Sequence, residues 1–197
     1  MSADQRRLGG RLPLHNSEAL APAQRKLFDQ LTTTAVPWAE GAGLRGRTEA
    51  GQLIGPFNPA LLTPDISSAF FEIQSAEENH TSLSERTRQV VILTVGAVWQ
   101  APYELYAHRA VGRQTGLSEQ AVRILAQGAV PNEPTDAEAV AHRVARALSV
   151  EHGVDDGLYR QAEAVFGTGG LMDIAVLAGI YHTVCAILTT FAIPAPS

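Results

Sequence analysis

The distribution of apolar and polar positions predicts a chain built from helices. Apolar residues gather in stretches of helical length, and no stretch alternates between apolar and polar residues with the period of a strand. Helices are predicted over residues 22–34, from 64 onward, over 82–101, 103–115, 118–127 and 135–148, and over 157–166 and 171–191. The expected fold class is all-α, with roughly eight helices in a single domain over residues 1–197, of which residues 1–15 form an extended arm.

Two sequence signals predict helix N-termini. Ser82 with Glu85, and Thr135 with Glu138, have the spacing of a capping box, in which each side chain satisfies a backbone donor near the other residue. The helix that follows Ser82 is apolar on nearly every side, which indicates a central position in the core. Pro102 is expected to end that helix.

A Gly-rich segment at residues 37–59 is predicted to be a long loop, which in a compact domain is usually functional or disordered. Its apolar end, around Phe57, indicates that this part packs over a pocket. A phosphate-binding loop is excluded because no Gly-Lys-Ser/Thr sequence follows the glycines.

Composition narrows the classes of partner. The chain has 197 residues, 45% of them hydrophobic and 18% charged, with a net charge of −5 and no cluster of Lys or Arg. A nucleic-acid surface is therefore not expected. Cys185 is the only cysteine, so no intrachain disulfide and no cysteine-based metal site can form, which fits a cytoplasmic protein. The first residues lack the apolar region of a secretory signal.

Residues 170–193 form an apolar segment that is long enough to cross a bilayer. Asp173 is its only formal charge, no Lys or Arg flanks it, and His182 and several threonines interrupt it. A buried core helix or an oligomer-interface helix has the same pattern, and we expect that alternative rather than a membrane span. The apolar length exceeds what a chain of this size needs to bury alone, which predicts a homo-oligomer.

Glu104 and His108 are the candidates for chemistry. Four residues apart on a helix, their side chains lie one above the other. A carboxylate beside an imidazole can orient it, raise its pKa and hold one tautomer, as proton transfer requires. The alternative is a surface ion pair on an amphipathic helix.

Residues 83–128, LSERTRQVVILTVGAVWQAPYELYAHRAVGRQTGLSEQAVRILAQG, resemble the core motif of the carboxymuconolactone decarboxylase and AhpD-like alkylhydroperoxidase superfamily. Residues 55–67, the last apolar helix and its FAIPAP ending are similar too, so the resemblance covers about residues 12–196. It implies an AhpD-like helical fold and a homo-oligomer, most simply a trimer or hexamer.

The peroxidase branch of this superfamily uses a Glu, a Cys-x-x-Cys pair and a His. In this sequence the matching positions hold Gln89, Ala101, Glu104 and His108, so only the histidine is retained. Without two thiols no disulfide can form there, which excludes peroxide reduction by that route. Cys185 alone would need an external thiol to act as a thiol-dependent peroxidase.

The decarboxylase branch is more similar, because it has Glu-Leu-x-x-His, here from Glu104 to His108. The resemblance implies a cofactor-independent lyase, decarboxylase or isomerase of aromatic-compound metabolism, acting on a small carboxylated or enolisable lactone-like substrate. In that hypothesis His108 protonates carbon as an imidazolium held by Glu104, and Arg88 or Arg109 binds the substrate carboxylate. The pair should then face one cavity, with residues 55–58 near its mouth. The expected substrate-binding residues are Tyr103, Arg88, Gln89, Phe57, Asn58 and His182.

Two alternatives remain open at this point. The chain could be a non-catalytic oligomeric protein with this fold, since the loss of the cysteines fits that as well. A metal site of Glu104, His108 and His182 is conceivable, because two imidazoles and a carboxylate bind iron or zinc. No His-x-x-x-His sequence or carboxylate cluster supports it, so we expect no metal and no cofactor.

Overall fold

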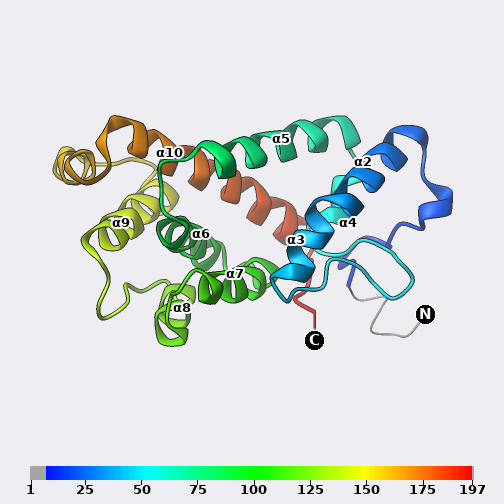
Figure 1. Ribbon diagram of the computed structural model, residues 1–197, viewed down its shortest axis with the longest axis horizontal. Coiled ribbons are helices and arrows are strands. Elements are labelled where there is room, and N and C mark those ends of the chain that lie inside the picture. The colour runs from blue at the N-terminus through cyan, green and yellow to red at the C-terminus, as the bar shows by residue number, and fades with distance from the viewer. Residues whose placement is uncertain (1–7, 197) are drawn as a thin grey trace. The chain divides into compact units, whose positions relative to one another are not determined.

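A computed structural model describes residues 8–196 and confirms the all-α prediction. The described residues are 68% helical, and among them there is no strand beyond an isolated bridge between Arg47 and Leu53. The elements in chain order are the 3-10 helix η1 (Ser17–Ala19) and the helices α2 (Pro22–Thr33), α3 (Ala35–Gly41), α4 (Phe57–Ala60), α5 (Pro64–His80), α6 (Glu85–Trp99), α7 (Pro102–Gln114), α8 (Glu119–Ala126), α9 (Asp136–Val150) and α10 (Asp156–Thr190) (Figure 1).

The chain forms two compact units. Among the described residues, the first comprises 8–74 with 186–196, and the second comprises 75–185. The long helices α5 and α10 each contribute residues to both units.

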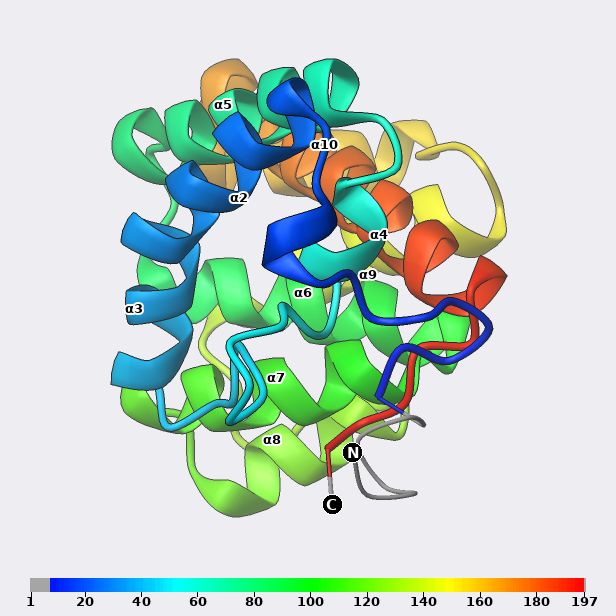
Figure 2. The same cartoon turned by 90° about the vertical axis from the view of Figure 1, so that its right-hand side faces the viewer.

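In the first unit, α2 leads into α3, and a loop connects α3 to the short helix α4 (Figure 2). Helix α2 buries Leu27 and Leu31. The predicted loop over residues 37–59 is wrong at both ends, because residues 37–41 belong to α3 and residues 57–59 belong to α4. Pro37 is the third residue of α3, a position in the first turn where its missing N–H removes no intrahelical hydrogen bond.

The predicted N-terminal arm is anchored where the structure describes it; residues 1–7 lie outside that range. Residues 8–15 contain no helix. The Arg11 backbone N–H donates to the Phe191 carbonyl at 2.7 Å. Gly10 has a φ of +62°, and a Cβ there would lie 2.2 Å from the same carbonyl oxygen, so only glycine allows this approach. Leu8 and Leu14 pack with Ile54 in a small apolar cluster.

In the second unit, α6 is central, as its apolar pattern predicted. It packs against α7, α8 and α9, and Val91, Ile92 and Val95 have no exposed surface (Figure 1). These residues share one core cluster with the inner faces of α9 and α10. The prediction of a buried, central helix is confirmed.

Capping residues begin the helices of the second unit. The Thr135–Glu138 capping box of α9 is present, and Ser118 caps α8 by accepting from Ala121 N–H at 3.1 Å. The predicted capping box at Ser82 is wrong, because Ser84 is the N-cap of α6 and accepts from Thr87 N–H at 3.2 Å.

The shift from Ser82 to Ser84 has a structural reason. The Ser82 hydroxyl and backbone N–H instead both donate to the Asp173 carboxylate, at 2.7 and 2.8 Å. With Ser84 as the cap, Glu85 is the first residue of α6, where a carboxylate interacts favourably with the helix dipole.

The last two predicted helices form one continuous element, α10, with a break at Gly167. This glycine has φ 68° and ψ 175°, a conformation outside the helical region, and it separates the two predicted segments. By length and composition α10 could cross a membrane. A soluble core helix meets the same criteria, and Ile174, Leu177 and Cys185 of α10 belong to the apolar core of the second unit.

Candidate functional site

Helices α6 and α7 bring Gln89, Glu104 and His108 together in the second unit. Gln100 ends α6 in the left-handed conformation with φ 50°, and Pro102 starts α7 as its first residue. The helices approach closely at Gly96, where a Cβ would lie 3.1 Å from the Glu104 Cγ. A glycine at this position therefore leaves room for the Glu104 side chain.

The three polar side chains are buried. Gln89, Glu104 and His108 are 4%, 3% and 5% exposed. The His108 Nδ1 lies 2.8 Å from the Gln89 amide oxygen, and the His108 Nε2 lies 3.2 Å from the Glu104 Oε1. The alternative of a surface ion pair is thus wrong, because neither member is at the surface.

The hydrogen bond to Gln89 fixes the histidine tautomer. An amide oxygen only accepts, so the His108 Nδ1 carries the hydrogen and donates it. In the neutral ring, the Nε2 then has a lone pair that faces the Glu104 Oε1. That oxygen is buried and otherwise has no hydrogen-bond partner. The contact is attractive in the neutral pair if Glu104 carries a proton directed at the Nε2.

Burial favours the neutral form of both Glu104 and His108, as the hydrogen-bond geometry does. It raises the pKa of Glu104 from 4.5 to about 8, and burial together with the positive charge of Arg88 lowers the pKa of His108 from 6.5 to about 3. Both groups are therefore neutral at pH 7, with a carboxylic acid beside a neutral imidazole. The expectation of an imidazolium held by a carboxylate is wrong, since a dry site disfavours both charges.

Two tyrosines border the pair. The Tyr181 ring meets the His108 ring edge-on, with centroids 5.0 Å apart and an interplanar angle of 89°. Tyr103 is 5% exposed and its ring lies 5.9 Å from that of Tyr106. Burial raises the pKa of both Tyr103 and Tyr181, and the nearby Glu104 also raises it, so both phenols stay protonated.

Arg88 is paired with Glu77. Its Nε and Nη2 donate to the two oxygens of the Glu77 carboxylate at 3.1 and 2.5 Å, and the two side chains are only 12% and 5% exposed. This bidentate pair satisfies the charge of Arg88 within the protein. Arg109, the other expected carboxylate ligand, is exposed.

His182 is held apart from the pair by its own hydrogen bonds. Trp99 Nε1–H donates to the His182 Nδ1 at 2.7 Å, so the Nε2 carries the ring hydrogen and donates to the Ser149 hydroxyl oxygen at 3.0 Å. Both ring nitrogens are therefore engaged. The conceivable metal site lacks this third ligand, and no group of three or more potential ligand residues occurs in the described part of the chain.

Phe57 and Asn58, two further expected substrate-binding residues, belong to the first unit. The Asn58 amide oxygen accepts from the His15 backbone N–H at 3.1 Å, and its nitrogen donates to the Pro13 carbonyl at 3.2 Å. Phe57 packs with its ring centroid 6.3 Å from that of Phe71. Both side chains thus have structural partners within their own unit.

Sequence reasoning missed Glu77 and Tyr181 at this site. Glu77 precedes Arg88 by eleven positions, across the turn between α5 and α6, and no helical spacing links the two. Tyr181 lies in the apolar stretch of α10, where nothing distinguishes it from a core residue. Neither residue is marked by a pattern, because Glu77 lies in the polar stretch AEENH and Tyr181 in an apolar helix.

Comparison of the sequence with models of protein families gives no match, and comparison with curated proteins gives none either. Solved structures do match. An uncharacterized peroxidase-related protein from Ralstonia eutropha JMP134, described as an alkylhydroperoxidase AhpD core, has a TM-score of 0.71 at 17% identity over 95% of this chain and 92% of its own. A peroxidase-related protein from Silicibacter sp. TM1040 gives 0.69 at 18% identity, over 94% and 91%.

The debrominase Bmp8 in complex with 2,3,4-tribromopyrrole also matches, with a TM-score of 0.67 at 14% identity over 89% of this chain and 90% of its own. At such identities the similarity establishes the fold. The fold that the sequence resemblance implied is therefore confirmed: this chain has the AhpD-like all-α fold.

Proposed function

We propose that this protein is a cofactor-independent acid–base enzyme, a lyase, decarboxylase or isomerase that acts on a small carboxylated or enolisable lactone-like molecule. The observation that carries the proposal is the buried pair of Glu104 and His108, in which the His108 Nε2 lies 3.2 Å from the Glu104 Oε1. A carboxylic acid and a neutral imidazole together provide a proton donor and a proton acceptor at pH 7.

The energetics of burial support a functional role for this pair. An ionisable side chain inside a protein costs free energy that apolar residues of similar size would not. Strong perturbation of a buried carboxyl by desolvation, beside a second titratable group, is typical of groups tuned for proton transfer. The pKa of Glu104, raised to about 8, lies close to the value at which a general acid works best at neutral pH.

Thiol chemistry is not supported by the surroundings of Cys185. This thiol has no exposed surface, and burial first and then the nearby Glu104 carboxyl raise its pKa. The thiolate is the reactive form, so a raised pKa makes the sulfur inert. Thiol-dependent peroxidase activity is therefore not proposed for this chain, although similar structures are of peroxidase-related proteins.

A non-catalytic oligomeric protein is the second candidate. The ordinary hydrogen bond from His108 to Gln89 favours it, since a satisfied buried network can also serve to specify the packing of α6 against α7. The two candidates differ in what the pair does to a bound carbonyl compound.

The test is proton exchange in D2O. We would incubate the protein with a panel of unsaturated lactones and follow deuterium incorporation next to the carbonyl by NMR. His108→Ala and Glu104→Gln should each slow exchange by roughly two to four decades, the range for loss of a general acid or base. His142→Ala on α9 is the matched control, because His142 is also buried, at 3% exposed.

Cys185→Ser tests the thiol alternative in the same assay and should leave exchange essentially unchanged. Equal rates for the wild type and His108→Ala, or a comparable loss in His142→Ala, would contradict the enzyme proposal and favour the non-catalytic candidate. A hundredfold loss in Cys185→Ser would show instead that the thiol participates.

A further inference from the structure

The charges around the buried pair cancel. Glu104 and His108 lie 3.2 Å apart, and burial favours the neutral form of both. The positive charge of Arg88 is matched by the Glu77 carboxylate through two hydrogen bonds. Tyr103 and Tyr181 remain protonated. The buried groups of the site therefore carry no net charge, and Glu78, whose charge also acts on Arg88 and Tyr181, is exposed to solvent.

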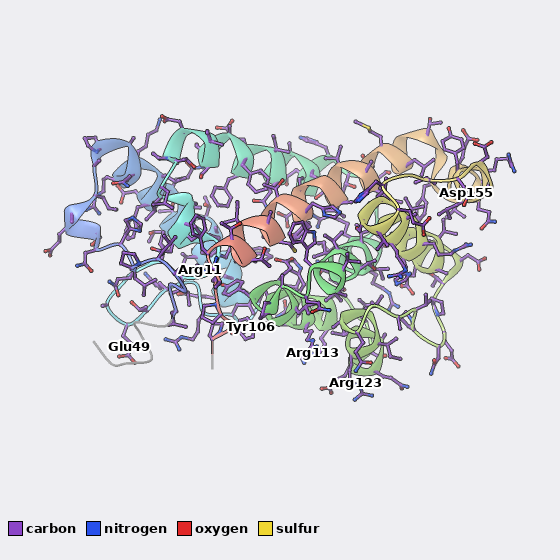
Figure 3. The ribbon with its side chains drawn as sticks, turned by 180° about the vertical axis from the view of Figure 1, so that it is seen from behind. Arg11, Glu49, Tyr106, Arg113, Arg123 and Asp155 are labelled. Carbon is purple, nitrogen blue, oxygen red and sulfur yellow. The ribbon has the colours of Figure 1, made fainter. Side chains whose placement is uncertain are left out.

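The other cations of this region lie at the surface. Arg109 of α7 is exposed, and Arg113 of α7 and Arg123 of α8 extend outward from their helices (Figure 3). A carboxylate that entered the site would have to compete with Glu77 for Arg88 or be buried without a counter-ion. Burying an unpaired carboxylate is strongly unfavourable, so an anionic substrate is excluded on energetic grounds.

We propose that the site takes an uncharged carbonyl compound with an acidic C–H bond next to the carbonyl, and moves that hydrogen to another carbon of the same molecule. This inference rests on the proposed function and narrows it to an isomerase. It replaces the carboxylated substrate that the sequence resemblance implied, because decarboxylation begins from a carboxylate anion.

The proton count of the pair suits such a step. The Glu104 proton turns from the His108 Nε2 to the carbonyl oxygen of the substrate and is donated there, and the Nε2 lone pair that it leaves accepts the hydrogen next to the carbonyl. The electron pair of the broken C–H bond forms a C=C bond, and the substrate becomes an enol. Reversal at a different carbon returns the Nε2 hydrogen to the substrate and the enol hydrogen to Glu104. No co-reactant is needed, and both side chains end as they began.

Gln89 is a positioning residue in this scheme. By accepting from the Nδ1 at 2.8 Å it keeps the ring hydrogen on that nitrogen, so the Nε2 retains the lone pair that acts as the base. A carboxylate in place of the amide would instead favour the imidazolium and remove the base.

Binding of a matched pair of probes tests the inference. α-Angelica lactone is uncharged, and levulinate is the carboxylate formed when its ring opens. We would titrate each into the protein and follow the His108 ring resonances by NMR. The lactone should shift them and exchange its hydrogens with D2O, and levulinate at the same concentration should do neither.

Glu77→Gln supplies the decisive variant, because it frees the charge of Arg88. Levulinate affinity should rise by about tenfold or more, as a charge-assisted hydrogen bond provides, while lactone affinity should change by less than about threefold. Glu119→Gln on α8 is the control, since it removes the same charge from an exposed position on another helix and should leave both affinities unchanged.

If Glu77→Gln does not fold, the double variant Glu77→Gln/Arg88→Gln removes both charges and keeps the site neutral. It should retain the affinity for the lactone within about threefold. A loss of affinity beyond about tenfold would show that Arg88 holds the substrate and would overturn the inference. Levulinate binding to the wild type as tightly as the lactone overturns the inference alone and leaves the enzyme proposal standing. Absence of binding by both probes, or a bound lactone that exchanges no hydrogen, overturns both.

Discussion

At the scale of single residues, the burial of Glu104 and His108 decides what the pair can do. Sequence spacing correctly placed the two side chains on one face of a helix, but it carried no information on the dielectric around them. The hydrogen bond from His108 to Gln89, nineteen positions earlier, could not be read from the spacing either. The spacing therefore correctly predicted that the two side chains meet, and wrongly predicted where the proton of the pair resides.

The same burial predicts how stability depends on pH. Glu104 has a pKa of 4.5 when unfolded and about 8 when folded, so between these values the folded protein holds a proton that the unfolded chain has lost. Below pH 6.5 the opposite effect of His108 offsets this one, so the net window runs from about pH 6.5 to 8. Stability should fall as the pH rises through that window, by roughly 2 kcal/mol. His108, with its pKa lowered to about 3, should make stability fall as the pH drops below about 4.5, and between these windows the two effects cancel.

Urea denaturation at a series of pH values measures this dependence. Glu104→Gln has no carboxyl to titrate and should lose the decline on the alkaline side. The matched control is Glu49→Gln, which removes a carboxylate from an exposed loop and should keep it (Figure 3). An alkaline decline that persists in Glu104→Gln would mean that the carboxyl is already ionised in the folded protein.

At the scale of elements, the helices could be predicted because the signals for a helix, its capping residues and its periodic apolar positions, lie within its own stretch of sequence. Errors arose where a distant group decided the outcome. Ser82 has the local spacing of an N-cap, but its hydrogen-bonding groups are directed to Asp173, 91 positions away. Pro37 was interpreted as the start of a loop, although a first helical turn accommodates proline equally well.

Ser84, as the N-cap of α6, should contribute to the stability of the protein. Ser84→Ala should destabilise the protein by about 1 kcal/mol, since the Thr87 N–H loses its acceptor at the helix N-terminus. Hydrogen exchange at the Thr87 amide should become faster in Ser84→Ala and stay unchanged in Ser82→Ala. Faster exchange in Ser82→Ala instead would favour the capping box predicted from the sequence.

At the scale of the whole molecule, the open question is self-association. The sequence argument relied on the apolar length of the last helix, but Ile174, Leu177 and Cys185 of α10 pack within the chain's own core. Part of that apolar surface is therefore already buried without a partner. Helix α5 presents a different surface: Ile66 and Ile73 are 72% and 52% exposed and lie two turns apart on one face.

We propose that this face of α5 contacts a second copy of the chain. Ala69 lies between the two isoleucines and is also exposed, so two antiparallel copies of α5 could approach closely there, with Ile66 beside Ile73 of the partner subunit. In that arrangement Asp65 and Glu72 would meet no like charge, because the opposing positions hold Gln74 and Ser67. Such a contact has two-fold symmetry and fits a dimer or the hexamer implied by the resemblance, but not a simple trimer.

Light scattering tests this contact directly. The wild type should have a mass that is an even multiple of 21.0 kDa at micromolar concentration. The double variant Ile66→Glu/Ile73→Glu places four carboxylates in each two-fold contact and should halve that mass or reduce it further. Met172→Glu on α10 is the control, because Met172 is 63% exposed but lies on another helix, and it should leave the mass unchanged. A monomeric wild type would refute self-association. Dissociation by Met172→Glu but not by the double variant would assign the contact to α10 instead, because the new carboxylate is buried without a partner only if α10 forms the contact.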